Sequence, residues 1–179
     1  SPSKNQIIEI GAVKVVNGSI TERFSTFVNP KVPIPFEIEQ LTSINDDMVL
    51  DAPTIDEILP KFMEFCQDAV MVAHNADFDM SFIKNCSALG LECEKTVLDT
   101  VALSRVLLPA LNRFKLDTVA KALNVSLAHH HRAVDDAECT ARIFEKFVGM
   151  CADKDITDVN QLNEQGKISP DTIKKLPTY

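Results

Sequence analysis

The dipeptide Asn17-Gly18 separates an apolar-rich, β-branched stretch at residues 7–16 from a second stretch at residues 20–28. This dipeptide readily adopts the positive φ angles of a type I′ turn, the two-residue turn that best joins antiparallel strands. The sequence therefore predicts a β-hairpin over residues 7–28. A hairpin this early in the chain favours a fold that contains antiparallel strand pairing.

The rest of the chain alternates between helical and strand patterns. Apolar residues at helical spacing predict helices over residues 54–65, 77–89, 100–108, 116–123 and 133–148. Short apolar runs predict buried strands at residues 69–73 and 96–98. Pro30, Pro33 and Pro35 predict an irregular crossing after the hairpin, and Gly149 is expected to close the last long helix. This order predicts an α/β fold in which helices cover a mixed sheet.

The last thirty residues differ in character from the rest. Residues 150–179 are polar, with two short turns headed by Thr157 and by Ser169-Pro170. A chain of 179 residues has the length of one domain with a sizeable core. We therefore expect one domain over residues 1–149, followed by a linker or the start of a neighbouring region over residues 150–179.

Charge and cysteine content narrow the class of partner. The net charge of −8 argues against a broad DNA clamp, because proteins that grip a long duplex through its phosphates are usually basic. A small site for one strand end fits this charge if divalent cations neutralise acidic side chains there. No apolar run is long enough to span a bilayer, so no membrane partner is expected. The five cysteines form no C-x-x-C pair, and Cys66, Cys86 and Cys139 fall within helical patterns, so we expect reduced, buried thiols and a cytoplasmic protein.

Two carboxylates are the first candidates for a functional site. Asp79 and Asp136 each fall in the first turn of a predicted helix, on or beside its apolar stripe, and are expected to face inward. A carboxylate in such a place must be paired, protonated or bound to a metal ion. The alternative, that each acid only offsets the helix dipole, stays open for either one alone. Two such acids on different helices favour a shared site.

Histidines and polar residues surround these carboxylates in the sequence. His131 precedes the helix of Asp136, and an imidazole accepts a proton from water near neutral pH; the alternative is that residues 129–131 form only a polar loop. His74 ends a predicted buried strand and is expected to be a core histidine with its hydrogen bonds satisfied. Asp99 is expected to be a helix N-cap, and Asn75 to bond local backbone or position a neighbouring ligand.

The chemistry of these side chains indicates a class of reaction. Carboxylate oxygens suit hard cations such as Mg²⁺ or Mn²⁺. Two such ions that bracket a phosphodiester activate water and stabilise the leaving oxygen. That mechanism normally needs more acidic oxygens than Asp79 and Asp136 provide. The residues alone therefore indicate a metal-dependent phosphoryl hydrolase with an incomplete ligand set.

Four segments in order resemble a known family, the DnaQ-like 3′–5′ exonucleases of the DEDDh branch. The residues His-Asn-Ala-Asp-Phe-Asp at 74–79 resemble its second motif, and His131 with Asp136 resembles its third. The strand at residues 7–13 is similar to its second strand, and residues 41–44 to the segment that lines the pocket for the terminal nucleotide. The match spans about residues 5–150. His-His-Arg-Ala before the last aspartate, and the tail, look most like the proofreading domains of PolC-type bacterial replicative polymerases.

The resemblance implies a fold and a set of roles. The fold would be ribonuclease H-like, a five-stranded mixed sheet with helices on both sides. Asp79 and Asp136 would be metal ligands for two Mg²⁺ or Mn²⁺ ions, and His131 the general base. The residues implied to contact the substrate or to support the second motif are Leu41, Thr42, Ile44, Asn75 and Phe78. The implied partners are a single-stranded or frayed DNA 3′ end and the rest of a polymerase chain.

One motif of the family has no match here. Its first motif, Asp-x-Glu on the first strand, would lie just before Ser1, and Glu9 on the following strand does not replace it. We therefore expect the chain to be part of a longer protein, with the first strand apparently missing from it. Two alternatives stay open: an exoribonuclease that trims RNA, and a non-catalytic exonuclease-like module that binds strand ends or a polymerase partner.

Overall fold

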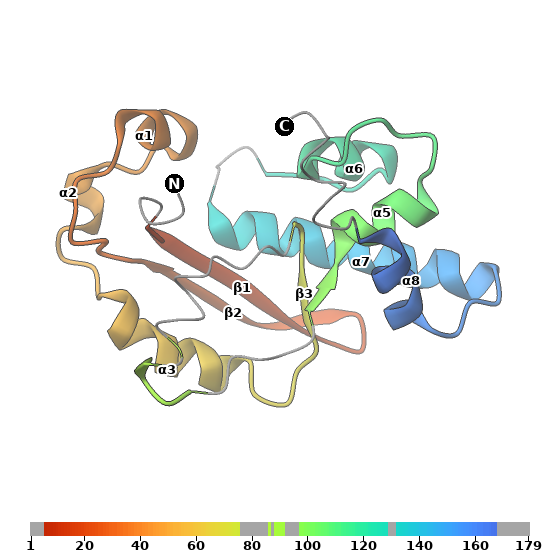
Figure 1. Cartoon of the computed structure of the whole chain (residues 1–179), viewed down its shortest axis with the longest axis horizontal. Coiled ribbons are helices and arrows are strands. Elements are labelled where there is room, and N and C mark those ends of the chain that lie inside the picture. The colour runs from red at the N-terminus through yellow and green to blue at the C-terminus, as the bar shows by residue number, and fades with distance from the viewer. Residues whose placement is uncertain (1–5, 76–85, 87, 92–96, 129–131, 168–179) are drawn as a thin grey trace.

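The computed structural model describes residues 6–75, 86, 88–91, 97–128 and 132–167 (Figure 1). Its strands are β1 Glu9–Val16, β2 Ser19–Phe27, β3 Met71–Ala73 and β4 Val97–Asp99. Its helices are α1 Phe36–Thr42, α2 Asp46–Val49, α3 Ile55–Phe65, α5 Thr100–Leu107, α6 Leu116–Ala122, α7 Ala133–Asp153 and α8 Val159–Gly166.

The predicted hairpin is confirmed. Strands β1 and β2 pair antiparallel, with Val16 opposite Ser19 at the closed end. Both turn residues have positive φ, 51° for Asn17 and 79° for Gly18, as a type I′ turn requires. The local chemistry of the Asn-Gly dipeptide is therefore sufficient to explain the connection.

The second strand pair is parallel. Met71 of β3 lies opposite Val97 of β4, and Ala73 lies opposite Asp99. Among the described residues the strands thus form two separate pairs, one antiparallel and one parallel, rather than the continuous five-stranded sheet that was expected. Helix α7 contacts β1, β2 and β3, and Figure 1 shows it running across both pairs. Among the described elements, the long helix therefore bridges the two strand pairs.

Two main apolar clusters lie on either side of this arrangement. The larger one packs α7 against α5, α6 and α8 and includes Leu103, Val119, Ile143, Phe147 and Leu162. The other packs the hairpin against α3 and includes Ile10, Val28, Leu59 and Phe62. The helix α3 lies on the hairpin because its buried residues recur at helical spacing on one face.

The region expected to be an irregular crossing contains two short helices. Pro35 stands just before α1, and its carbonyl accepts the backbone N–H groups of Ile38 and Glu39. A proline at this boundary does not oppose a helix, because the first N–H groups of a helix have no intrahelical partner. Asn45 caps α2 by accepting from the Met48 N–H at 3.0 Å. The prediction of an irregular crossing was therefore wrong at Pro35, which marks the start of a helix.

The last long helix does not end at Gly149 as predicted. Helix α7 continues to Asp153, and Asp155 after it adopts a left-handed conformation with φ 55°. The N–H of Ile156 donates to the carbonyl of Cys151, and the N–H of Asp155 donates to that of Ala152. These two bonds form a Schellman motif, so an aspartate takes the place that glycine usually occupies.

The described residues beyond 150, up to residue 167, pack onto the rest of the structure. Asp158, rather than Thr157, caps α8, and it accepts from the Gln161 N–H. Asn163 of α8 is buried and accepts from the Asp99 N–H at 2.7 Å at the end of β4. Arg105 of α5 donates to the carbonyl of Gly166 at 3.1 Å. Ser169-Pro170 lies outside the described residues.

The cysteine prediction is partly wrong. Cys66, Cys139 and Cys151 are buried thiols outside any disulfide, as expected. Cys86, also buried, is disulfide-bonded, whereas a reduced thiol was predicted. Helical spacing predicts burial of a thiol but not which other sulfur it meets in space. In the described part of the chain, no helix is both long and apolar enough to cross a membrane.

Candidate active site

The predicted site residues divide into two groups. Asp79, Phe78 and His131 lie outside the described residues, so their roles stay predictions. Asp136, Asn75 and the segment 41–44 lie within them.

Asp136 lies in the first turn of α7 and is exposed. Thr140, Ile143 and Phe147 follow on the same face and are buried. The stripe was therefore identified correctly, but the prediction that Asp136 faces inward is wrong, because burial begins one turn later. An accessible carboxylate at a helix N-terminus suits a ligand that approaches from outside.

The buried thiol of Cys139, one turn after Asp136 on α7, is held in its protonated form. Burial, with a contribution from the charge of Asp136, raises the pKa of Cys139 to about 11. The thiol therefore stays protonated, and only a thiolate is a good nucleophile or metal ligand. Among the described residues at the start of α7, the carboxylate of Asp136 therefore offers oxygen as a ligand.

Glu9 of β1 fixes the start of α7. Its Oε1 accepts the N–H of Ala133 at 2.9 Å, which satisfies an N–H that has no partner within the helix. Gly11, two residues further along β1, lies so close to α7 that a Cβ there would collide with the backbone of Ala133 and Val134. Sequence reasoning placed Glu9 outside the first motif but did not find this capping role. The one hint in the sequence was the glycine at position 11, which allows another element to approach β1 closely.

Arg132 connects the start of α7 with α1. One guanidinium nitrogen donates to the carbonyl of Thr42 at 2.6 Å, and the other lies 3.8 Å from Glu9 Oε2. The guanidinium also lies over the ring of Phe27, 5.5 Å from its centroid. Arg132 is half-buried and Glu9 is 9% exposed, so the pair is only partly screened by water.

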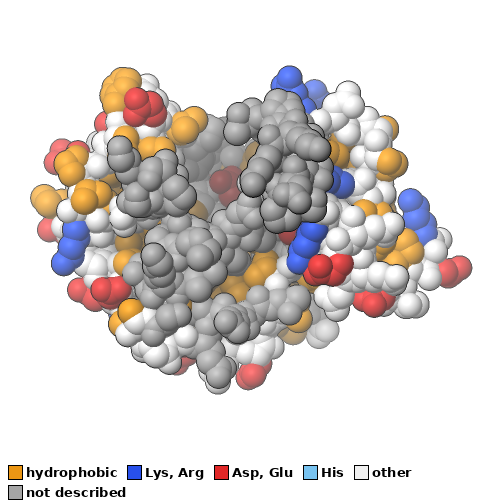
Figure 2. All heavy atoms as spheres, in the orientation of Figure 1, with side chains coloured by type: hydrophobic (Ala, Val, Ile, Leu, Met, Phe, Trp, Pro, Cys, Tyr) orange, Lys and Arg blue, Asp and Glu red, His pale blue; other side chains and the backbone are white. Residues whose placement is uncertain are grey.

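The segment expected to contact a nucleotide is held from two sides. The Thr42 hydroxyl donates to the Ile38 carbonyl at 2.7 Å and accepts from the Ile44 N–H at 3.2 Å. Leu41 is 72% exposed, whereas Ile44 is 1% exposed and packs with Ile34 and Val49. Leu41 can therefore touch a ligand, and Ile44 supports the segment from within. Figure 2 shows the apolar side chains gathered over α1 and α2 on this face.

Asn75 and Asp99 meet where the two parallel strands end. Asp99 Oδ1 accepts the Asn75 N–H at 2.9 Å and also caps α5 by accepting the Val101 N–H at 2.8 Å. The predicted N-cap role of Asp99 is thus confirmed. Asn75 has φ 66°, and its N–H, which lies within the second motif, is held by Asp99 at the end of β4.

His74 is a structural histidine, as predicted. Its Nε2 lies 2.6 Å from the Phe114 carbonyl, which can only accept, so Nε2 carries a proton. In the neutral ring Nδ1 then accepts from the Thr100 hydroxyl at 2.7 Å. Burial lowers the pKa of His74, which keeps the ring neutral near pH 7.

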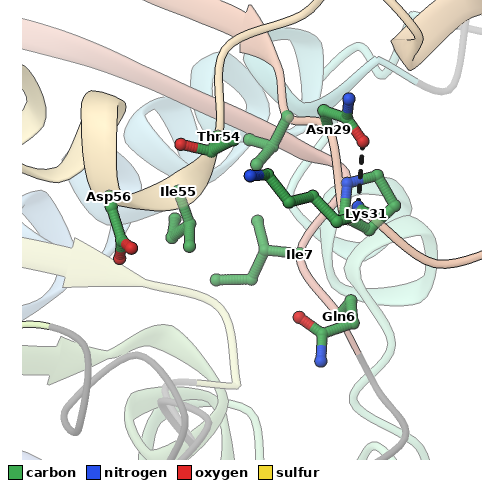
Figure 3. Close-up of a pocket in the computed structure, with 9 residues that line it drawn as sticks. Gln6, Ile7, Asn29, Lys31, Thr54, Ile55 and Asp56 are labelled. Atoms are coloured by element: carbon green, nitrogen blue, oxygen red, sulfur yellow. Dashed lines mark hydrogen bonds between the residues drawn. The ribbon is translucent and has the colours of Figure 1, made fainter.

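Two other features complete the inventory. Within the residues that the structure describes, no three His, Cys, Asp or Glu side chains form a metal-binding group. A small cavity of about 140 Å³ has no residue of α7 in its lining (Figure 3). Figure 3 shows it lined by residues 6 and 7 before β1, by Asn29 and Lys31 after β2, and by the start of α3. It contains none of the predicted site residues.

The fold is the ribonuclease H-like fold seen in DEDDh exonucleases. The solved structure of Exonuclease X in complex with 5′ overhanging duplex DNA is similar, with a TM-score of 0.71 and 26% sequence identity over 92% of this chain and 93% of that chain. The nuclease domain of 3′hExo, a DEDDh family member, bound to rAMP, has the same fold, with a TM-score of 0.66 and 20% identity over 80% of this chain and 81% of that chain.

A family model described as Exonuclease matches residues 1–144, so the chain belongs to the exonuclease family. The chain is 51% identical over 176 residues to a DNA polymerase III PolC-type protein of Caldanaerobacter subterraneus subsp. tengcongensis. It is 52% identical over 181 residues to a protein of the same name from Clostridium perfringens. These alignments cover 98% and 100% of this chain but only 13% and 12% of the relatives. The predicted family and fold class are confirmed, and membership implies dependence on divalent metal ions.

Proposed function

We propose that this chain is the proofreading 3′–5′ exonuclease domain of a bacterial replicative DNA polymerase, and that it works in the cytoplasm. It would remove single nucleotides from a frayed or single-stranded DNA 3′ end. The observation that supports this most is the alignment of nearly the whole chain, at about half identity, with one segment of PolC-type polymerases. The DNA-bound Exonuclease X neighbour supports DNA as the substrate.

We propose roles for the residues one by one. Asp136, exposed at the start of α7, would hold a divalent ion together with Asp79. The chemistry of this donor set fits Mg²⁺ or Mn²⁺, since both are carboxylates. When bound, two such ions supply an activated water and stabilise the leaving oxygen. His131 would accept the proton of the attacking water at its imidazole.

The substrate would be held by the segment that ends α1. Leu41 and Thr42 would contact the terminal nucleotide, with Ile44 holding the segment from inside the core. Asn75 and Phe78 would support the second motif from the end of β3. A mispaired 3′ end frays more readily than a paired one, so selectivity would come partly from melting rather than from reading the base.

A gel assay tests the proposal. Single-stranded DNA labelled at its 5′ end is incubated with the chain and Mg²⁺ or Mn²⁺, with EDTA as control, and the same DNA labelled at its 3′ end is run in parallel. A ladder shortened from the 3′ end, with release of labelled mononucleotide, supports it. Because the resemblance places a further motif before Ser1, the same assay is run on a longer version that includes the preceding residues.

Two other functions remain as outcomes of the same experiment. Faster shortening of an RNA of equal sequence would favour the RNA-trimming alternative, to which the rAMP-bound fold neighbour draws attention. Tight binding of strand ends without any shortening, in both versions of the chain, would favour the non-catalytic module and contradict the proposal.

A further inference from the structure

The guanidinium of Arg132 joins two segments that the proposed function uses separately. On one side it donates to the Thr42 carbonyl at 2.6 Å, in the segment expected to touch the terminal nucleotide. On the other side it belongs to the N-cap residue of α7, one position after His131 and four before Asp136. Arg132 and Thr42 are 90 residues apart in the sequence.

Glu9 and Thr42, two of the residues that the Arg132 guanidinium contacts, are themselves fixed. Glu9 lies 3.8 Å from the guanidinium and holds the Ala133 N–H at 2.9 Å, so one carboxylate serves both the arginine and the helix start. Thr42 is the last residue of α1, and Ser43 after it is left-handed with φ 59°. The carbonyl that Arg132 contacts therefore lies where α1 ends and its own helical bonds stop.

We propose that Arg132 is a positioning residue that aligns the nucleotide-contacting end of α1 with the catalytic groups at the start of α7. The inference rests on the proposed function for its effect on the rate, but the coupling itself is a property of the fold. Arginine suits this position because its rigid fork reaches a carbonyl and a carboxylate at once. A lysine ammonium is a single point of charge and cannot keep both contacts in one geometry.

Loss of this contact predicts a specific pattern of rates. In Arg132→Met the two segments would shift relative to each other, and a misplacement of about 1 Å can cost about 10²-fold in rate. The single-turnover rate on single-stranded DNA should fall by about that factor, while the Kd for the DNA changes less. Arg132→Lys, which keeps the charge near Glu9, should fall between Arg132→Met and the wild type.

Hydrogen exchange gives a readout that does not depend on activity. In Arg132→Met the Ser43 and Ile44 amides should exchange about 10-fold faster, because α1 loses a bond to a charged donor at its end. Arg142→Met is the matched control, since Arg142 lies on the same helix but pairs with Glu145 instead of α1. It should change neither the exchange at residues 43–44 nor the rate.

The outcomes separate this inference from the proposed function. Unchanged exchange at residues 43–44 in Arg132→Met, or an equal loss of rate in Arg142→Met, overturns the positioning role. If neither the chain nor its longer version has nuclease activity, the proposed function fails, and exchange still decides whether Arg132 couples the segments. Should Arg132→Met not fold, Arg132→Lys decides, with faster exchange expected at the same two amides.

Discussion

The two ends of α7 are held by different kinds of interaction. At the C-terminal half, Phe147 and Cys151 are buried against α5 and α8, and apolar contacts dominate. At the N-terminal end, Glu9, Arg132 and the Thr42 carbonyl form polar and charged contacts, and Asp136 is exposed. Apolar packing is strong but non-directional, whereas hydrogen bonds fix orientation. One end of the helix thus stabilises the fold, and the other end orients the candidate site.

The strongest test of this difference between the two ends of α7 is to remove the charge of Asp136. Asp136→Asn should reduce turnover by about 10³-fold or more, because a metal ligand is worth several kcal/mol in the transition state. Its thermal midpoint should stay near that of the wild type, since the side chain is exposed. The measurement is single-turnover digestion of labelled DNA beside a melting curve. Unaltered turnover would remove Asp136 from the mechanism, and Asp135→Asn serves as the control.

At the C-terminal end of α7, substitution should reduce stability rather than turnover. Phe147→Ala should cost about 3–5 kcal/mol of the free energy of unfolding, because it leaves a cavity in the larger apolar cluster. Denaturant titration measures this cost. Val148 is 44% exposed, so Val148→Ala should change stability by less than about 0.5 kcal/mol. Equal losses in the two variants would contradict the account of this end of α7.

Two glycines allow the start of α7 to be compared with the packing of α8 on α5 by one type of substitution. A Cβ at Gly11 would collide with the start of α7, and one at Gly166 would collide with the backbone of Ala102 in α5. Each Gly→Ala change should cost about 1–3 kcal/mol through overpacking. Only Gly11→Ala should also lower the rate of the folded protein, because it displaces the helix that carries Asp136. An equal fall in rate in both variants would show that the loss of activity is not specific to the start of α7.

The smallest expected effect is a pH dependence at His74. Burial lowers the pKa of His74 in the folded state, so the unfolded state takes up the proton first as the pH falls. The stabilisation is therefore complete above the unfolded value of 6.5 and is lost as the pH falls below it. Melting curves from about pH 8 to pH 5 should show this loss in the wild type, and less of it in His74→Asn. An identical slope in both proteins would contradict this account of His74.

The sequence predicted those parts of the molecule that depend on neighbouring residues. The hairpin follows from Asn17-Gly18, and the capping of α5 follows from Asp99 two residues before the N–H that it accepts. The assignment of His74 to the core followed from its place at the end of an apolar run. In each case the physical cause lies within a few residues, so a local pattern is enough.

Contacts between distant segments could not be predicted in the same way. The bond from Ala133 to Glu9 joins residues 124 apart, and the bond from Arg132 to Thr42 joins residues 90 apart. The exposure of Asp136 depends on how far the core extends along α7, which helical periodicity does not fix. The disulfide at Cys86 likewise depends on which sulfurs meet in space. Knowledge of the family pointed to the site, but only the structure showed how it is held.

The central claim is that the exposed carboxylate at the start of α7 holds a catalytic metal ion. Titration with Mn²⁺ followed by electron paramagnetic resonance tests it directly, on a version of the domain that is active in the gel assay. We expect Asp136→Asn to bind Mn²⁺ at least about 10-fold more weakly than the wild type, and Asp135→Asn to bind it equally well. Equal affinity in all three proteins would contradict the claim.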